Sequence, residues 1–429
     1  MKVVVIGGGA AGFFGAIACA ESNPHGSVLL LEASPQVLSK VRISGGGRCN
    51  VTHACFEPTA LVQYYPRGSK ALRGPLSQFQ PKDTIDWFAQ RGVELKTEKD
   101  GRMFPVTDSS ETIVNCLVSA ARAAGVEVWT GAAVTQISVD GASRFRVQVK
   151  SRSVDSSGIQ ETGIQDTGIQ ETGMNCDRLL LATGSHPLGY RLAASLGHPM
   201  MSPVPSLFTF NLSDPRLQGL AGVSVGAVKL QLLVENQKPL EQTGPLLITH
   251  WGISGPAVLK LSAWGARILH ETRYRATLQI NWVPDLTAEA LRSRLVQAKV
   301  DVPKRAVLTH SPAALPQRLW QRLVSAAGIS AELRWGDLSK QGLNRLLLEL
   351  QQGRFEIQGK GVFKDEFVTC GGIDLKAVNF KTMESRSCPG LFFAGEILDI
   401  DGVTGGFNFQ NAWTTGWIAG QAIVKSIIQ

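Results

Sequence analysis

Three glycines near the start of the chain have the spacing that lets a backbone hold a diphosphate. Gly7, Gly9 and Gly12 form a Gly-x-Gly-x-x-Gly pattern. The first glycine allows a sharp turn, the second lets the diphosphate approach, and the third brings a helix against a strand. Glu32 follows twenty residues after Gly12, where a carboxylate can accept hydrogen bonds from ribose hydroxyls. The pattern predicts a dinucleotide site.

The residues around Glu32 favour an adenosine ribose without a 2′-phosphate. The Glu32 carboxylate would repel that phosphate, and the following Ala33-Ser34-Pro35 supplies no arginine to hold it. We therefore do not expect NADP at this site. NAD and FAD share this half of the pattern and stay open at this point.

A second glycine-rich stretch, SGGGRCNVTHAC at 44–55, contains three glycines, an arginine and two cysteines. Three interpretations are open. The glycines and Arg48 could form a phosphate cradle, Cys49 and Cys55 could form a redox dithiol, or the stretch could be a flexible loop.

The first dinucleotide pattern needs a strand before it and a helix after it, and the sequence supplies both. Lys2–Ile6 is a short β-branched run, Ala10–Ser22 is rich in Ala and Phe, and Ser27–Leu31 is a second apolar run. This order predicts a strand–helix–strand unit with parallel strands and a right-handed crossover.

The C-terminal part of the chain distinguishes FAD from NAD. An apolar strand leads to Ala394-Gly395-Glu396, and the glycine-rich loop 402–406 precedes a helix expected to begin near Asn408–Asn411. This arrangement, with Ala182-Thr183-Gly184 at the end of another strand, resembles flavoproteins of the glutathione-reductase structural class. In that class the acid binds the ribityl chain and the helix N-terminus stabilises negative charge on the reduced flavin. The resemblance favours FAD.

Apolar patterning predicts the remaining elements. In the first half we expect helices at 82–91 and 110–124 and strands at 126–129, 133–137, 145–150 and 178–182. From residue 200 we expect strands at 207–212, 228–234, 246–249, 276–282, 354–357 and 366–369, with helices over 286–350. The five-residue repeat GIQETGIQDTGIQETG, 158–173, has one apolar residue per unit, so we predict a surface loop on a β-hairpin.

The bulk composition predicts a folded cytoplasmic protein. The 429 residues are 44% hydrophobic and include seven scattered cysteines, which fits a reducing compartment better than a disulfide framework. We find neither a signal peptide nor an apolar run of about 20 residues, and we predict no membrane association and no metal site.

The net charge of +8 is concentrated in one segment. Residues 286–345 contain ten Lys/Arg and four Asp/Glu. Because Leu343, Leu346, Leu347 and Leu350 recur at helical spacing there, we expect a solvated helical face and no nucleic-acid partner. Nucleic-acid binding by this segment stays open as the alternative.

Several motifs together resemble one bacterial family over nearly the whole chain. They are SGGGRCNVTH (44–53), GRMFP (101–105), THWGISGP (249–256), GGIDLKAVNFKTMESRSCPGLFFAGEILDIDG (371–402) and TGGFNFQNAW (404–413). The chain is similar to FAD-dependent oxidoreductases related to aminoacetone oxidase and to the flavin reductase of bile-acid dehydroxylation.

The resemblance implies an α/β fold in which a Rossmann-type, glutathione-reductase-like FAD-binding domain is made from both chain ends. An inserted β-barrel-like domain carries a helical subdomain. The implied boundaries are 1–195 and 373–429 for the FAD-binding domain, 196–284 and 353–372 for the β-rich domain, and 285–352 for the helical insertion.

The resemblance also answers the question about 44–55. It implies that Ser44 to Asn50 wraps the flavin side of FAD, which favours the cradle. Disulfide reductases place four residues between their cysteines, whereas five separate Cys49 from Cys55. The predicted FAD contacts are Gly7, Gly9, Ala10, Ala11, Gly12, Glu32, Ala33, Lys40, Ser44, Gly45, Gly46, Arg48, Asn50, Ala133, Val134, Thr183, Gly184, Gly395, Glu396, Asp401, Gly405, Gly406, Phe407 and Asn408.

Two residues are candidates for catalysis. Arg102 could hold an anion or a carbonyl oxygen, with an ion-pair role as the alternative, and His250 could transfer a proton, with a structural role as the alternative.

We expect an FAD-dependent oxidoreductase that moves hydride between flavin and a small organic substrate or NAD(P)H. Oxygen or an organic acceptor completes the cycle. No second Gly-x-Gly-x-x-Gly lies between a strand and a helix, so NAD(P)H would bind only transiently. The alternative is an FAD-containing RNA-binding or RNA-modifying protein. The oligomeric state stays open.

Overall fold

The computed structural model divides the chain into two compact units, which are described separately. The described residues are 1–140, 144–152, 169–235, 237–361 and 368–425. The first unit comprises 1–203 and 368–429, and the second comprises 204–367. The boundaries expected from the sequence are 195 and 372. The difference arises because β11 (Met200–Ser206) pairs with β19 (Val368–Ile373), which keeps 200–203 and 368–373 in the first unit.

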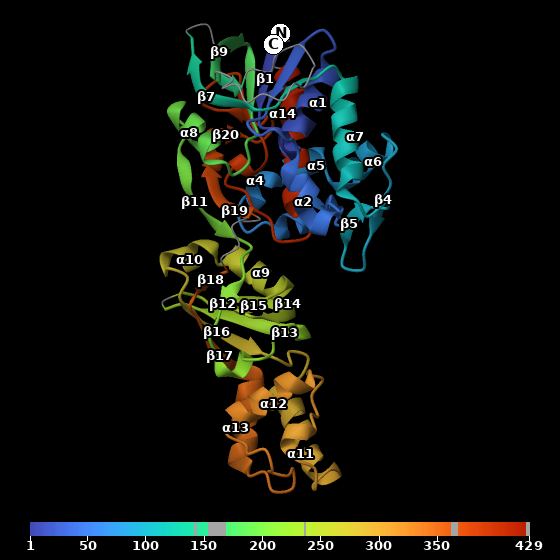
Figure 1. Ribbon diagram of the computed structural model, residues 1–429, viewed down its shortest axis with the longest axis vertical. Helices are drawn as coiled ribbons and strands as arrows, with labels where there is room; N and C mark the ends of the chain where they lie inside the picture. Colours follow the sequence, from blue (N-terminus) through green and yellow to red (C-terminus); the bar gives the residue numbers. More distant parts are fainter. Residues whose placement is uncertain (141–143, 153–168, 236, 362–367, 426–429) are drawn as a thin grey trace, which may run out of the picture. The chain divides into compact units, whose positions relative to one another are not determined.

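The first unit is built on a seven-stranded sheet that combines strands from both chain ends (Figure 1). Parallel pairing joins β2 to β1, β1 to β10, and β10 to β22. The sheet order is β20 (Val378–Asn379), β21 (Glu384–Ser385), β22 (Leu391–Phe393), β10 (Arg178–Leu181), β1 (Lys2–Ile6), β2 (Ser27–Leu31) and β6 (Glu127–Trp129). The expected strand–helix–strand start is confirmed.

Two helices from opposite ends of the chain pack together in this unit (Figure 1). They are α1 (Ala10–Ser22) and α14 (Phe407–Lys425). A Cβ on Gly416 would lie 2.6 Å from the Ala11 carbonyl oxygen, and one on Gly420 would lie 2.4 Å from the Gly15 oxygen. Only glycine permits such short distances between the two backbones. Gly416 and Gly420 therefore let α14 pack closely against α1. The Rossmann-type architecture made from both chain ends is confirmed.

Smaller elements complete the first unit. The other helices are α2 (Ser39–Gly47), α3 (Pro58–Leu61), α4 (Ser69–Leu72), α5 (Pro75–Gln78), α6 (Pro81–Ala89), α7 (Ser110–Ala123) and α8 (Pro187–Ser195). Two further sheets have the orders β3 (Thr52–His53), β5 (Arg102–Pro105), β4 (Leu95–Thr97), and β7 (Ala132–Val139), β8 (Phe145–Arg152), β9 (Ile169–Cys176).

The end of the five-residue repeat lies in a strand. Residues 169–173 belong to β9, which pairs antiparallel with β8. The prediction of a loop over all of 158–173 is therefore wrong for these residues, because pairing with a neighbouring strand satisfies their backbone groups despite their polar composition. Residues 158–168 lie outside the described part of the chain.

The second unit contains a seven-stranded antiparallel sheet. Its order is β17 (Gly353–Ile357), β16 (Ala276–Asn281), β13 (Ser224–Leu233), β14 (Leu240–Thr249), β15 (Gly252–Ser254), β12 (Phe210–Asn211) and β18 (Gly359–Lys360). The continuous stretch 353–360 pairs with β16 through its first half and with β12 through its second. This closes the sheet into the expected barrel-like form. Two helices, α9 (Pro256–Trp264) and α10 (Ala266–Glu271), accompany it.

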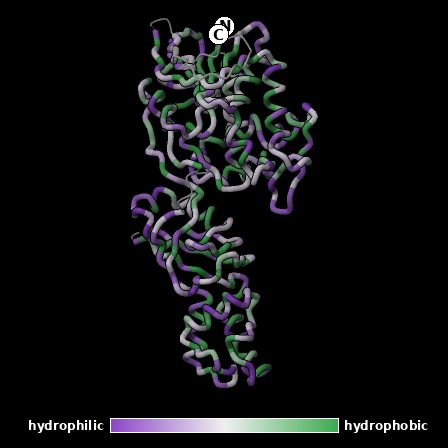
Figure 2. The backbone as a smooth tube through the Cα atoms, in the orientation of Figure 1, coloured by the Kyte–Doolittle hydropathy of each residue, from purple (hydrophilic) through white to green (hydrophobic). Residues whose placement is uncertain are grey.

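Three helices are inserted between β16 and β17: α11 (Ala288–Asp301), α12 (Gln317–Ala326) and α13 (Lys340–Gln352). Figure 2 shows hydrophobic and hydrophilic residues alternating along them. Their core includes Trp320 and Trp335, whose stacked rings lie 6.4 Å apart. Each helix therefore buries one face and leaves the opposite face to solvent.

Among the described residues, no helix combines the length and the apolar character needed to cross a membrane.

Candidate functional site

The first glycine turn is sterically tight where a helix meets a strand. The Gly7 N–H donates to the Leu31 carbonyl at 2.8 Å, and Gly7 has a φ of +110°. A Cβ on Gly12 would lie 1.9 Å from the Gly7 carbonyl oxygen. These contacts hold the start of α1 against the ends of β1 and β2.

The next glycine in the turn faces open space. A Cβ built on Gly9 has no heavy atom within 4 Å. Gly9 is the N-cap of α1, and the helix has neither a capping side chain nor an acidic residue in its first turn. The first N–H groups of the helix, from Ala10 and Ala11 onward, therefore have no capping or acidic side chain of the helix beside them. Their partial positive charge suits a phosphate.

Glu32 lies at the end of β2 beside this turn. Its carboxylate accepts hydrogen bonds from Gly8 N–H and Ser34 N–H, both at 2.7 Å. These bonds hold the carboxylate next to the glycine turn, and each oxygen keeps further lone pairs for a ribose hydroxyl.

The neighbouring predicted contacts follow the same strand end. Ala33 is exposed. The Ala132 N–H donates to the Glu32 carbonyl at 2.8 Å. This bond holds the start of β7, which includes Ala133 and Val134, beside the end of β2.

The second glycine-rich stretch interrupts α2. Ser44 has an extended ψ of 152°, and Gly45 and Gly46 have φ values of +58° and +70°. A Cβ on Gly46 or Gly47 would meet no heavy atom within 4 Å. The backbone therefore leaves the helix within the stretch that the resemblance favours as a cradle, and it has open space beside it. The role of this stretch in FAD binding stays a prediction.

This loop is tied to the start of α14. The Asn50 side-chain oxygen accepts from Gly406 N–H at 2.9 Å. Beside it, Gly405 and Gly406 have φ values of +133° and +92°. Phe407, the first residue of α14, is buried, and its ring stacks on those of His53 and Tyr64 at 4.6 and 4.4 Å.

Asn408 has a structural partner. Its amide oxygen accepts from Gly402 N–H at 2.8 Å, and its amide nitrogen donates to the Gly402 carbonyl at 2.9 Å. The side chain thus fixes the turn before α14. The helix has no acidic residue in its first turn, so its positive end is free to act on a bound anion.

Glu396 follows β22 and links three segments. It accepts from the Lys40 ammonium at 2.6 Å and from Thr369 N–H at 3.0 Å. Gly184 lies close by, since a Cβ there would be 3.7 Å from a Glu396 oxygen. The preceding Gly395 donates its N–H to the Thr415 hydroxyl of α14 at 2.9 Å. The structure thus brings the predicted residues Lys40, Gly184, Gly395 and Glu396 together.

Asp401 is fully buried and forms an ion pair with an arginine. Both carboxylate oxygens accept hydrogen bonds from the Arg67 guanidinium, whose side chain is 13% exposed. The pair joins the segment before α4 to the loop before α14. A direct contact of Asp401 with FAD stays a prediction.

The two predicted arginines share an ionic cluster at the β4–β5 hairpin. Arg48 pairs with Glu98 at 2.7 Å and with Asp108 at 3.4 Å, and lies 4.0 Å from the centre of the Phe104 ring. Arg102 pairs with Glu98 at 3.0 Å and with Asp100 at 2.8 Å. Arg102 thus makes the kind of contact that the ion-pair alternative expects. A role of Arg102 in catalysis stays a prediction.

The two cysteines of the stretch lack the features of a redox dithiol. Cys49 is buried, and burial raises the pKa of its thiol to about 12. Burial also raises the pKa of Cys55. Reactive cysteines instead have a lowered pKa that favours the thiolate.

We expect Cys49→Ser to retain wild-type turnover, because a thiol held protonated does not exchange with a disulfide. Steady-state kinetics with FAD content measured in parallel would check this, with Cys55→Ser as the matched variant. A loss of turnover in both variants at full FAD content would restore the dithiol interpretation.

His250 belongs to the second unit. It lies exposed in the turn between β14 and β15, next to Trp251, whose surface is 40% exposed. Its role in proton transfer stays a prediction.

Sequence reasoning missed several residues that position this region. Gln410 of α14 is buried, and its amide oxygen accepts from the hydroxyls of Thr52 at 2.6 Å and Thr84 at 3.0 Å. The signal available was a polar residue within an apolar helix, which indicates a buried hydrogen-bond network.

The residues present fit FAD. Gly9 leaves space at an uncapped helix start, and Glu32 lies beside it. Two buried oxygens, Thr183 Oγ1 and Asn411 Oδ1, have no hydrogen-bond partner among the described residues. Buried polar groups normally have partners, and the hydroxyl and amide groups of FAD could supply them.

Comparison with known proteins agrees with this geometry. The model of the HI0933-like protein Rossmann domain matches residues 1–422. The chain is 28% identical to the 3-dehydro-bile acid delta(4,6)-reductase of Clostridium scindens, with 99% of both chains covered. It is 29% identical to the ribosomal RNA dihydrouridine synthase of Escherichia coli, with 99% and 98% covered.

A solved structure shares the fold. The 3-ketosteroid-delta4-(5alpha)-dehydrogenase of Rhodococcus jostii RHA1 matches with a TM-score of 0.50 at 14% identity, over 98% of this chain and 96% of that one. The chain belongs to the HI0933-like family of Rossmann-fold, FAD-dependent oxidoreductases.

Proposed function

We propose that this protein is a reductase that saturates a carbon–carbon double bond conjugated to a carbonyl group. The observation that carries the proposal is the pair of full-length relatives. One is named for reduction of a 3-dehydro-bile acid and the other for synthesis of dihydrouridine in ribosomal RNA. The substrates differ, but both names denote the addition of two hydrogens to such a bond, so the bond is the shared feature.

FAD, when bound, supplies hydride transfer. Saturation takes up one hydride and one proton for each double bond. We propose that a reduced nicotinamide dinucleotide supplies the hydride and leaves oxidised, while solvent or an acidic side chain supplies the proton. His250 and Arg102 stay the candidates for proton transfer and for holding the carbonyl oxygen.

The residues of the first unit would bind and orient the cofactor. The N–H groups at the start of α1 and the carboxylate of Glu32 suit the diphosphate and the adenosine ribose. Glu396, held by Lys40 and by Thr369 N–H, suits the ribityl hydroxyls. The uncompensated start of α14 suits negative charge near the flavin pyrimidine.

A second candidate substrate is a uracil base within RNA, which is compatible with the alternative, left open by the sequence, of an FAD-containing RNA-binding or RNA-modifying protein. It is favoured by the relative from Escherichia coli and by the ten basic residues of the helical insertion.

Anaerobic mixing tests the proposal. We expect NADH or NADPH to bleach the flavin absorbance, and a 3-oxo-4-ene steroid or a uridine-containing RNA to restore it with formation of the saturated product. The matched control is the corresponding saturated compound, which should leave the flavin reduced. Bleaching by a small amine, followed by reoxidation with oxygen alone, would instead indicate an oxidase and contradict the proposal.

A further inference from the structure

Basic residues dominate the charge of the helical insertion. None of the ten Lys/Arg side chains between 286 and 345 forms an ion pair within the described part of the chain. By contrast, Lys229 and Arg216 of the same unit are paired with Glu241 and with Asp214 and Glu349. The insertion therefore presents positive charge that the protein itself does not neutralise.

Two of these arginines converge on one turn. Arg318 and Arg322 are spaced i, i+4 on the exposed face of α12. The Arg318 guanidinium donates to the Gly219 carbonyl, and Arg322 Nη2 lies 3.6 Å from where a Cβ on Gly219 would be. Two like charges are thus directed at the same place, which favours an anion between or beside them.

A cavity lies at this point. It has a volume of about 270 Å³ and is lined by Arg318, Arg322, Gln321, Ser325, Gly219, Leu220 and Leu308. The guanidinium groups and the Ser325 hydroxyl suit phosphate oxygens, while Leu220 and Leu308 offer an apolar wall to a sugar or base. No acidic side chain lines the cavity.

We propose that this cavity binds backbone phosphates of RNA, so that the helical insertion holds an RNA substrate; the choice of RNA rests on the proposed function. Phosphate contacts fix a nucleic acid in position without reading its sequence. The unpaired charge of the insertion extends the favourable surface beyond the cavity.

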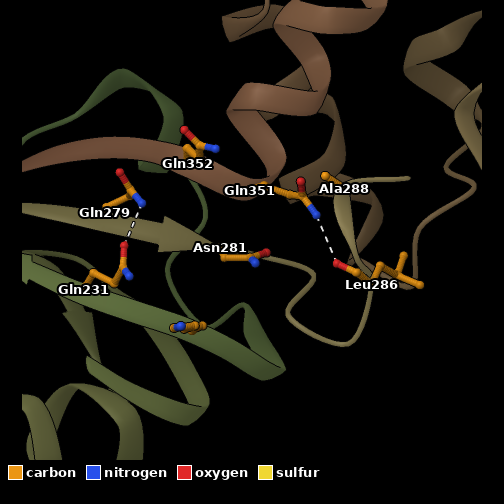
Figure 3. A pocket seen from close by; sticks show the side chains of 8 residues that line it. Gln231, Gln279, Asn281, Leu286, Ala288, Gln351 and Gln352 are labelled. Carbon is orange, nitrogen blue, oxygen red and sulfur yellow. Dashed lines mark hydrogen bonds between the residues drawn. The ribbon is translucent and has the colours of Figure 1, made fainter. Parts of the chain in front are cut away.

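A second cavity of the same unit has groups suited to bases. Figure 3 shows amide side chains around it, with Gln279 donating to Gln231 and Gln351 donating to the Leu286 carbonyl. Its volume is about 290 Å³. Asn and Gln amides can both donate to and accept from base edges, so this cavity complements the phosphate site chemically.

Binding to a fluorescein-labelled, uridine-containing single-stranded RNA tests the proposal, using the full-length FAD-loaded protein across a salt series. We expect Arg318→Gln/Arg322→Gln to weaken binding at least ten-fold at low salt. Each lost phosphate contact should also lower the slope of log K against log salt by about 0.7. The matched control is Arg91→Gln/Arg144→Gln, which removes the same charge from residues paired with Glu21 and Asp177 and should retain binding.

Arg322→Gln alone is the second variant, for use if the double variant misfolds. It should not disturb the fold, because Arg322 forms no hydrogen bond within the described residues. Failure of the wild-type protein to bind RNA, equal losses in both double variants, or binding only to vesicles of acidic phospholipid would overturn the site. Because no reductant is present, the result is separate from the function test. If the protein reduces a steroid enone but does not bind RNA, only the proposed RNA site is refuted. If it binds RNA through the two arginines but reduces no substrate, only the reductase proposal is refuted.

Discussion

Gly9→Ala should leave the protein folded but weaken its binding of FAD. The backbone at Gly9 has a φ of −91°, which alanine adopts without strain, and the added Cβ meets no protein atom within 4 Å. It would instead occupy the space that a diphosphate needs at the start of α1. We expect FAD affinity to fall at least ten-fold, or about 1.4 kcal/mol. Visible absorbance after dialysis would measure this, alongside the thermal unfolding of the apoprotein.

Gly12→Ala provides the matched comparison. Its Cβ would lie 1.9 Å from the Gly7 carbonyl oxygen, so α1 must move away from β1. We expect this variant to lose FAD and also about 1 to 3 kcal/mol of stability, as overpacking does. Retention of FAD by Gly9→Ala would contradict the assigned diphosphate site. Wild-type stability of Gly12→Ala would contradict the described packing of the turn.

Asp401→Ala should produce the largest loss of stability. It leaves the largely buried Arg67 guanidinium without its carboxylate, and breaking a buried ion pair costs about 3 to 5 kcal/mol. Chemical denaturation would measure the change in the free energy of unfolding. Lys229→Ala is the control, because its pair with Glu241 is 40% and 45% exposed and should contribute less than about 1 kcal/mol.

The comparison with Arg67→Ala separates two roles of Asp401. If Asp401 acts only as the partner of Arg67, both variants should lose FAD to the same extent. A much larger loss of FAD in Asp401→Ala would show that its carboxylate contacts the cofactor directly, as the resemblance implied. Near-wild-type stability in both variants would contradict the buried pair itself.

Elements with strong local patterns could be predicted closely from the sequence. The strands β1 and β2 and the helix α1 have the expected bounds, because the apolar runs and the glycine turn are local signals. The start of β9 was missed because its residues, such as Gln170 and Glu171, are polar and lie in a strand only through pairing with β8.

Contacts between distant segments could not be predicted. Arg67 and Asp401 are 334 residues apart, and Thr52 and Gln410 are 358 apart. No periodicity specifies such pairs, because they depend on how both chain ends fold onto one sheet. Arg48 shows the same limit, because its residue type suits a phosphate. Its partners are instead Glu98 of the β4–β5 hairpin and Asp108 of the segment after β5, and the tertiary fold brings both beside it.

The arrangement of both chain ends also determines when the cofactor domain can be completed during synthesis. Strand β22 and helix α14 are made long after β10 and α1, yet they supply the neighbour of β10 and the partner of α1. Residues 204–367 emerge from the ribosome before them. Until β22 and α14 emerge, the nascent N-terminal part exposes an apolar sheet edge and an apolar helix face, and surfaces of this kind are the ones that chaperones cover.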